Sequence, residues 1–260
     1  MKGIIINEKI IEYSKEYNSN RNYKIIANAL SKNSIQSVIY NNDILANTQF
    51  KFSHEIETLK VTNQKKSGRC WIFAGLNILR EIIAKKLNLE NIEFSQNYVA
   101  FWDKFEKINN FLECIIDTVE EPIDSRIINW IVQTGVKDGG QWEMFTNIVE
   151  KYGVVPKEVM PETFLSSNTE TMNGVLNTKL RKAASILRKM YVRGKSKKNI
   201  MQEKENMLKE FYSFLCVCFG EPPKEFVWEY RDKNRIFIRT ETIKPKEFFN
   251  LYIGEILKIM

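Results

Sequence analysis

Apolar residues recur at the spacing of an α-helix immediately after the tryptophan at position 71. The residues that form this stripe are Ile72, Leu76, Leu79, Ile83 and Leu87. Steps of four, three, four and four positions place all of them on one face of a helix. The pattern therefore predicts an amphipathic helix over residues 71–87.

Helical spacing continues through the middle of the chain. Ser95 is a typical N-cap residue, and the aromatic and aliphatic residues after it continue as a second helical face as far as Leu112. Further helices are predicted over residues 127–132 and 142–152, each followed by a glycine that favours helix termination. Residues 157–177 contain a proline and a Ser/Thr/Asn cluster, and we predict a loop there.

The spacing of apolar residues stays helical as far as residue 219 and becomes strand-like after it. Two long helices are predicted over residues 179–192 and 199–219, with a basic turn between them. After Pro222 and Pro223, strand-like alternation over residues 226–230 and 235–242 predicts a β-hairpin.

The first sixty residues differ from the rest. Residues 17–23 are a polar stretch that we expect to interrupt regular structure, and residues 25–30 form a short helical candidate. No packed core is evident in this part of the sequence. We expect residues 1–60 to form an N-terminal arm.

Composition narrows the class of protein. The chain has 260 residues, of which 43% are apolar and 27% are charged, as in ordinary globular proteins. No apolar run is long enough for a bilayer-spanning helix. The apolar stretch at the start of the chain is too short for a secretory signal, so we expect none. Four cysteines are too few for a disulfide scaffold, so we expect reduced thiols, a cytoplasmic location and no membrane association.

Charge is unevenly distributed. The net charge is +7, yet nine lysines and arginines and no acidic residue lie between Lys179 and Lys198. Such a cluster can face nucleic acid, an acidic partner or only water, and all three interpretations stay open.

The strongest chemical signal is the segment 64–71, which reads QKKSGRCW. Cys70 stands at the first turn of the predicted helix, where unpaired N–H groups and the helix dipole stabilise a thiolate. The side-chain amide of Gln64 can reach the same place as the Cys70 N–H, and two converging donors suit a tetrahedral oxyanion. Gly68 lets a substrate approach without a side chain in the way.

These residues resemble the active-site segment of papain-like cysteine peptidases. Residues 60–74, KVTNQKKSGRCWIFA, are more narrowly similar to the bleomycin hydrolase / aminopeptidase C branch. Residues 94–98, 138–142 and 228–233 support the same branch, so the resemblance covers nearly the whole chain. It implies an α+β, papain-like fold and a cysteine aminopeptidase that hydrolyses N-terminal peptide bonds of a peptide substrate.

The resemblance also assigns roles to residues. Cys70 corresponds to the nucleophile and Gln64 to the oxyanion-hole donor. Gly139 and Gly140 match the paired glycines that border the substrate cleft, where a bare backbone edge can pair with an extended peptide. No metal or organic cofactor is implied.

The same comparison suggests how the chain is divided. Beyond the arm, residues 61–165 would be the helical papain-like lobe with the nucleophile helix, and residues 166–225 a helical insertion. Residues 226–260 would be only the start of a truncated β lobe. Members of the branch form hexamers with a basic channel that in some binds nucleic acid, and we expect the C-terminal lobe to help close such a ring.

The chain departs from the family pattern in one respect. Papain-like enzymes use a histidine after the cysteine as base and acid, and an asparagine that orients it. Here the single histidine, His54, precedes Cys70, and we expect it to be structural or solvent-facing. We therefore expect an N-terminal part of such an enzyme that is inactive alone, or a non-catalytic relic that binds polyanions or co-assembles with full-length subunits.

The remaining cysteines suggest packing. Cys216 and Cys218 are separated by one residue and have no second ligand pair nearby, which is a poor metal site. We expect them to pack among Phe211 and Leu215, and Cys114 to pack in the second helix.

Overall fold

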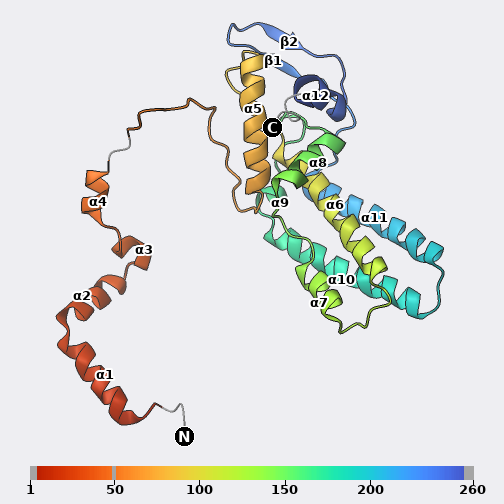
Figure 1. Cartoon of the computed structure of the whole chain (residues 1–260). Helices are drawn as coiled ribbons and strands as arrows, with labels where there is room; N and C mark the ends of the chain where they lie inside the picture. Colours follow the sequence, from red (N-terminus) through yellow and green to blue (C-terminus); the bar gives the residue numbers. More distant parts are fainter. Residues whose placement is uncertain (1–4, 49–50, 255–260) are drawn as a thin grey trace. The chain divides into compact units, whose positions relative to one another are not determined.

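The computed structural model describes residues 5–48 and 51–254 (Figure 1). The chain divides into two units, residues 1–56 and residues 57–260, and each is described here by itself.

The first unit is a succession of short helices. They are α1 (Asn7–Ser19), α2 (Arg21–Leu30), α3 (Ile35–Val38) and α4 (Asn42–Asn47). Asn20 separates the first two, and its side chain accepts a hydrogen bond from the Asn22 N–H at the start of α2. The predicted helix at residues 25–30 is confirmed within α2. Residues 17–23, which we expected to be a polar break, are helical except for Asn20, because this one N-cap residue is enough to separate α1 from α2. None of the four helices buries a residue.

The second unit begins with helices whose ends follow the predicted signals. They are α5 (Cys70–Lys86), α6 (Gln96–Asp117), α7 (Arg126–Thr134) and α8 (Trp142–Tyr152). The Ser95 hydroxyl caps α6 by accepting a hydrogen bond from the Tyr98 N–H at 3.0 Å. Gly135 and Gly153 end α7 and α8 with φ of +54° and +83°, the left-handed region that glycine tolerates. The predicted helices are confirmed here.

Two long helices follow, preceded by a short one. They are α9 (Phe164–Ser167), α10 (Glu170–Val192) and α11 (Lys197–Phe219). The prediction of a loop over residues 157–177 is wrong in its second half, because α10 begins nine residues before residue 179. Met172 and Leu176 are buried one turn apart, and the polar residues that follow them, Asn173 and Asn177, are helical and bind a neighbouring loop through their side chains.

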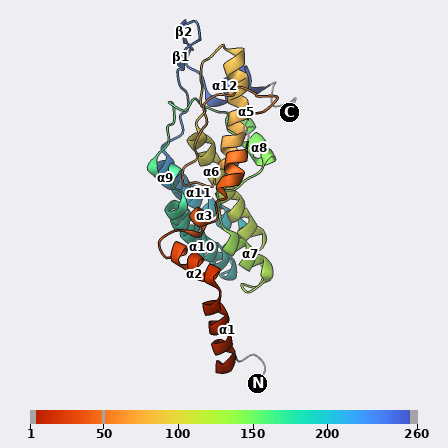
Figure 2. The same cartoon turned by 90° about the vertical axis from the view of Figure 1, so that its left-hand side faces the viewer.

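The long helices form the body of this unit. α6 packs against α10 and α11, which lie side by side with it in both views (Figures 1 and 2). α5 and α8 pack against each other and against α6. Phe101, Ile108 and Leu112 of α6 are almost fully buried, as are Leu76 of α5 and Leu215 of α11. Their burial supplies the hydrophobic stabilisation of the helical layers.

The chain ends in a small β element and a further helix. Strands β1 (Glu229–Arg231) and β2 (Phe237–Arg239) pair antiparallel, with Tyr230 opposite Ile238. The predicted hairpin is confirmed, with shorter strands. Helix α12 (Pro245–Tyr252) was not predicted; it packs against α8, and its two phenylalanines are buried.

The described helices include none with the length and apolar character needed to cross a bilayer. The sequence-based boundaries at residues 60, 165 and 225 stay predictions.

Candidate active site

Cys70 is the first residue of α5, and it is exposed. Its helix has no side-chain N-cap, because the residue at that position, Arg69, has no side-chain acceptor for a backbone N–H. The first N–H groups of a helix lack partners within it, so they are free to act on a group bound beside the thiol. The position combines an accessible sulfur with backbone donors.

Gln64 begins the loop that leads to this cysteine. The hydroxyl of Ser67 donates to the Gln64 carbonyl at 2.6 Å and closes a turn. Within that turn, Lys65 has φ of +56°, a left-handed conformation that is uncommon for a residue with a side chain. Gln64 is half-buried and its Oε1 has no hydrogen-bond partner among the described residues. Convergence of its amide with the Cys70 N–H stays a prediction.

A buried ion pair anchors the residue just before the nucleophile candidate. Arg69 is almost fully buried, and its two Nη atoms donate to the two carboxylate oxygens of Glu162 at 3.1 and 2.9 Å. Its Nε donates to the Ser67 Oγ at 2.9 Å, and Ser166 donates to Glu162 from the far side. Bidentate geometry of this kind fixes orientation as well as position. The loop before Cys70 is thereby held to the segment before α9.

The glycine pair lies beside the residue that follows Cys70. Trp71 donates its indole N–H to the Asp138 carbonyl at 2.8 Å. A Cβ on Gly140 would lie 2.6 Å from the Trp71 ring, whereas a Cβ on Gly139 would meet nothing within 4 Å. Close approach therefore requires glycine at position 140, and Gly139 is exposed and open. The structure thus places both glycines in the loop bound by the neighbour of Cys70.

Asp138 connects the two loops. Its Oδ2 accepts from the Gly68 N–H at 3.3 Å and from Thr169 at 2.6 Å, and its Oδ1 accepts from Asn173 at 3.0 Å. The buried Lys104 Nζ lies 2.6 Å from Oδ1. Burial alone would raise the pKa of Asp138, but Lys104 and these hydrogen bonds outweigh it and hold the pKa well below its ordinary value. Asp138 is therefore an anion throughout the neutral range.

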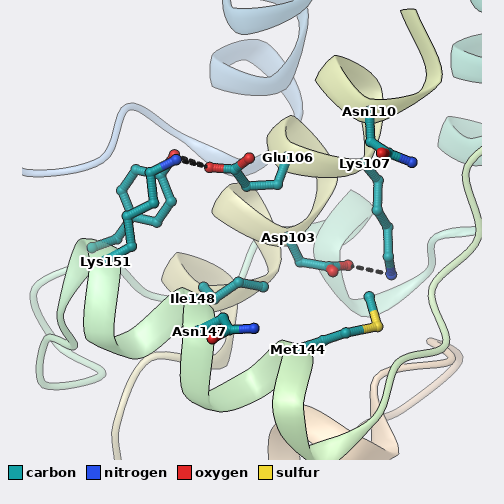
Figure 3. Close-up of a pocket in the computed structure, with 9 residues that line it drawn as sticks. Asp103, Glu106, Lys107, Asn110, Met144, Asn147, Ile148 and Lys151 are labelled. Atoms are coloured by element: carbon teal, nitrogen blue, oxygen red, sulfur yellow. Dashed lines mark hydrogen bonds and ion pairs between the residues drawn. The ribbon is translucent and has the colours of Figure 1, made fainter. Parts of the chain in front are cut away.

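A second, buried carboxylate belongs to Asp103, the residue just before Lys104 on α6. Asp103 accepts a hydrogen bond from Lys107 at 2.8 Å (Figure 3). Burial raises the pKa of Asp103 to about 6, against the opposing effect of Lys107. Both residues line a pocket of about 350 Å³ between α6 and α8.

Sequence reasoning missed several of these residues. Asp138 was recognised only as part of a motif, and Glu162, Asp103, Lys104 and Lys107 were not singled out. Lys104 did carry a signal, because it lies on the same helical face as Phe101 and Ile108. A lysine on an apolar face requires a buried anionic partner.

The other candidates from the sequence are the single histidine and the three further cysteines. His54 is exposed and its ring Nδ1 is 3.1 Å from the Ser53 hydroxyl, so the expected solvent-facing position is confirmed. Cys218 is buried in the core, while Cys114 and Cys216 are half-buried against it. No group of three metal-ligating side chains occurs within residues 5–48 and 51–254.

The basic cluster occupies α10, the turn after it and the start of α11. Seven of its nine side chains are exposed: Arg181, Lys182, Lys189, Arg193, Lys195, Lys197 and Lys198. Arg188 instead donates to the backbone carbonyls of Thr118 and Glu121. The cluster is therefore a largely solvated cationic surface.

Several known proteins are similar to this chain. Residues 4–259 match the Peptidase C1-like family. The chain is 44% identical over 251 residues to an aminopeptidase C from Listeria monocytogenes, and 38% identical over 251 residues to the bleomycin hydrolase of Homo sapiens. These alignments cover 96% and 95% of the chain, but 56% and 55% of the relatives.

A solved structure is also similar. The crystal structure of PepW from Lactobacillus rhamnosis superposes with a TM-score of 0.91 at 39% identity, covering 98% of this chain and 57% of that one. The chain thus spans little more than half the length of the relatives that it matches.

Proposed function

Because the chain belongs to the Peptidase C1-like family, we propose that the protein is a cysteine aminopeptidase that hydrolyses N-terminal peptide bonds by thiolate attack. Membership confirms the predicted α+β, papain-like fold and the resemblance to the bleomycin hydrolase / aminopeptidase C branch. The observation that supports the proposal most is an exposed cysteine at the start of α5, beside a side-chain-free glycine edge.

In this proposal Cys70 attacks the scissile carbonyl carbon. The carbonyl oxygen becomes an oxyanion, which the Cys70 N–H and the Gln64 side-chain amide stabilise by hydrogen bonds. Gly139 and Gly140 bind the backbone of the peptide substrate. The arrangement needs no metal or organic cofactor.

Turnover also needs a base that takes the thiol proton and returns it to the leaving amine. The sequence has no histidine after Cys70, and its single histidine, His54, precedes the cysteine and is exposed. We therefore propose that Cys70 of the 260-residue chain can be alkylated by a reagent, but that this chain by itself does not hydrolyse peptides. Loss of the base from such a catalytic group lowers kcat by roughly 10⁶-fold.

Iodoacetamide labelling followed by peptide mass mapping tests this. We expect modification of Cys70 first, since Cys114, Cys216 and Cys218 are half-buried or buried. The Cys70→Ser variant should lose this rapid phase. Preferential labelling of another cysteine would contradict the proposed nucleophile, and steady release of a fluorogenic amino-acid amide would contradict the proposed inactivity.

The exopeptidase part of the proposal needs its own assay. Protein purified from its natural source should cleave an amino-acid amide with a free amino group and leave the N-acetylated amide uncut. Equal cleavage of both would contradict an aminopeptidase.

A second candidate function is polyanion binding by a non-catalytic relic, and the exposure of seven basic side chains favours it. Affinity for a random oligonucleotide should then fall steeply with salt, because bound lysines and arginines release counterions. Replacing Lys195, Lys197 and Lys198 by Gln should reduce that salt dependence. Weak binding that ignores both salt and these substitutions would eliminate this candidate.

Assembly and location are part of the same proposal. We propose a hexamer or co-assembly with full-length subunits, as the resemblance implies, to be measured by analytical ultracentrifugation. We propose a cytoplasmic location, where thiols such as those of the four cysteines stay reduced.

A further inference from the structure

Lys107 of α6 is bonded to the loop that carries the glycine pair. Its Nζ donates to the Gly139 carbonyl at 2.7 Å, to the Lys137 carbonyl at 3.2 Å and to Asp103 Oδ2 at 2.8 Å. An ammonium group has three protons, and here each has one acceptor. Figure 3 shows the Lys107 and Asp103 side chains meeting at the edge of the pocket.

The surroundings hold this ammonium group in place. The Asp103 side chain is 3% exposed and that of Lys107 is 18% exposed, so little water competes for the contact. The Lys107 Nζ also lies 5.3 Å from the centroid of the Trp71 ring, within the range of a cation–π interaction. Lys107 therefore touches both the glycine loop and the residue after Cys70.

These contacts determine how the peptide between the two glycines is oriented. This peptide is trans, so the carbonyl of Gly139 and the N–H of Gly140 point in opposite directions. Because the carbonyl is bound to Lys107, the N–H points away from Lys107. No acceptor for the Gly140 N–H is found among the described residues. The donor is thus left available to an incoming backbone carbonyl.

We propose that Lys107 is a positioning residue for the substrate edge: by holding the Gly139 carbonyl, it orients the Gly140 N–H to bind a backbone carbonyl of the peptide. The inference rests on the proposed function of the glycine pair and adds to it the group that orients the pair. Lys107 touches neither the thiol nor the scissile bond in this role.

Alkylation of Cys70 by two reagents separates this role from a structural one. Iodoacetamide needs only the thiolate, whereas a chloromethyl ketone carrying a dipeptide also needs the glycine edge. The ratio of their second-order rate constants measures the contribution of the peptide backbone. In Lys107→Met we expect this ratio to fall by about tenfold, the effect of losing one well-oriented hydrogen bond. The iodoacetamide rate should be unchanged.

A matched control comes from the same pocket. Lys151→Met removes another lysine, one that binds Glu106 and not the loop, and its ratio should equal that of the wild type. Since Lys107→Met leaves Asp103 buried without its cation, the double variant Asp103→Asn/Lys107→Met keeps the test available if the single variant unfolds. It should show the same lowered ratio.

The outcomes are distinct. An unchanged ratio in both Lys107 variants would overturn the proposal, and so would an equal loss of rate for both reagents. If the wild type itself reacts no better with the peptidyl reagent than an exposed cysteine in a short peptide does, the proposed peptidase site fails instead, whatever Lys107 does.

Discussion

Replacing Glu162 by Gln removes the negative charge that faces Arg69 and leaves most of the local shape intact. The Arg69 side chain is 2% exposed, whereas that of Glu162 is 21% exposed. The two members of this ion pair therefore depend on each other to different degrees. Loss of the carboxylate leaves a guanidinium in the protein interior, but loss of the guanidinium leaves a carboxylate that water can reach.

The magnitude follows from this asymmetry. Removing one partner of a buried pair lowers the free energy of unfolding by about 3–5 kcal/mol. Gln keeps one acceptor and water reaches position 162, so we expect Glu162→Gln to lower it by about 2–3 kcal/mol. For Arg69→Met we expect only about 1–2 kcal/mol, because Glu162 keeps the hydrogen bond from Ser166 and becomes hydrated.

The assay is urea unfolding at neutral pH, followed by the fluorescence of the five tryptophans. The double variant Arg69→Met/Glu162→Gln should be less destabilised than the sum of the single variants, which measures the coupling of the pair. A reversed order of the single variants, or strict additivity, would refute the assignment of a buried, mutually dependent ion pair.

Three further predictions concern the loop that holds the glycine pair. Gly140→Ala places a Cβ against the Trp71 ring and should lower the free energy of unfolding by about 1–3 kcal/mol. The matched Gly139→Ala change should be nearly neutral. Similar urea midpoints for the two variants would contradict the close packing of Gly140 on Trp71. Asp138→Asn deprives the buried Lys104 of its carboxylate and should lower the free energy of unfolding by about 3–5 kcal/mol at neutral pH. Because the folded pKa of Asp138 lies below the unfolded one, its contribution is complete above the unfolded pKa and is lost as the pH falls. The difference between wild type and Asp138→Asn should thus narrow below about pH 4, and a constant difference across acid titration would contradict it.

The sequence predicted well those elements that repeat a period over several turns. The helix that begins at Cys70 has four apolar residues in register and a fifth, Leu87, at its C-cap, so its place was readable from one segment alone. The first turns of α10 were missed because Asn173 and Asn177 resemble loop residues. Their side chains bind the loop around Val136 and Asp138, which only the folded chain brings near.

The site divides in the same way. Cys70 and Gln64 belong to one short segment, and local sequence sufficed to propose their roles. Glu162 lies 93 residues from Arg69, and no spacing rule relates the two. Residues so far apart in the sequence meet only through tertiary packing. The spacing of apolar residues in one sequence does not show which of them will meet.

The unequal burial of Arg69 and Glu162 also bears on how this loop can change over evolutionary time. If Glu162 is replaced first, the intermediate protein has a buried Arg69 without its anion. If Arg69 is replaced first, the intermediate has a Glu162 carboxylate that water can reach. The second intermediate keeps more of the native stability than the first. The residue beside the cysteine is therefore the member of the pair that can vary first, and the distant glutamate is free to drift only afterwards.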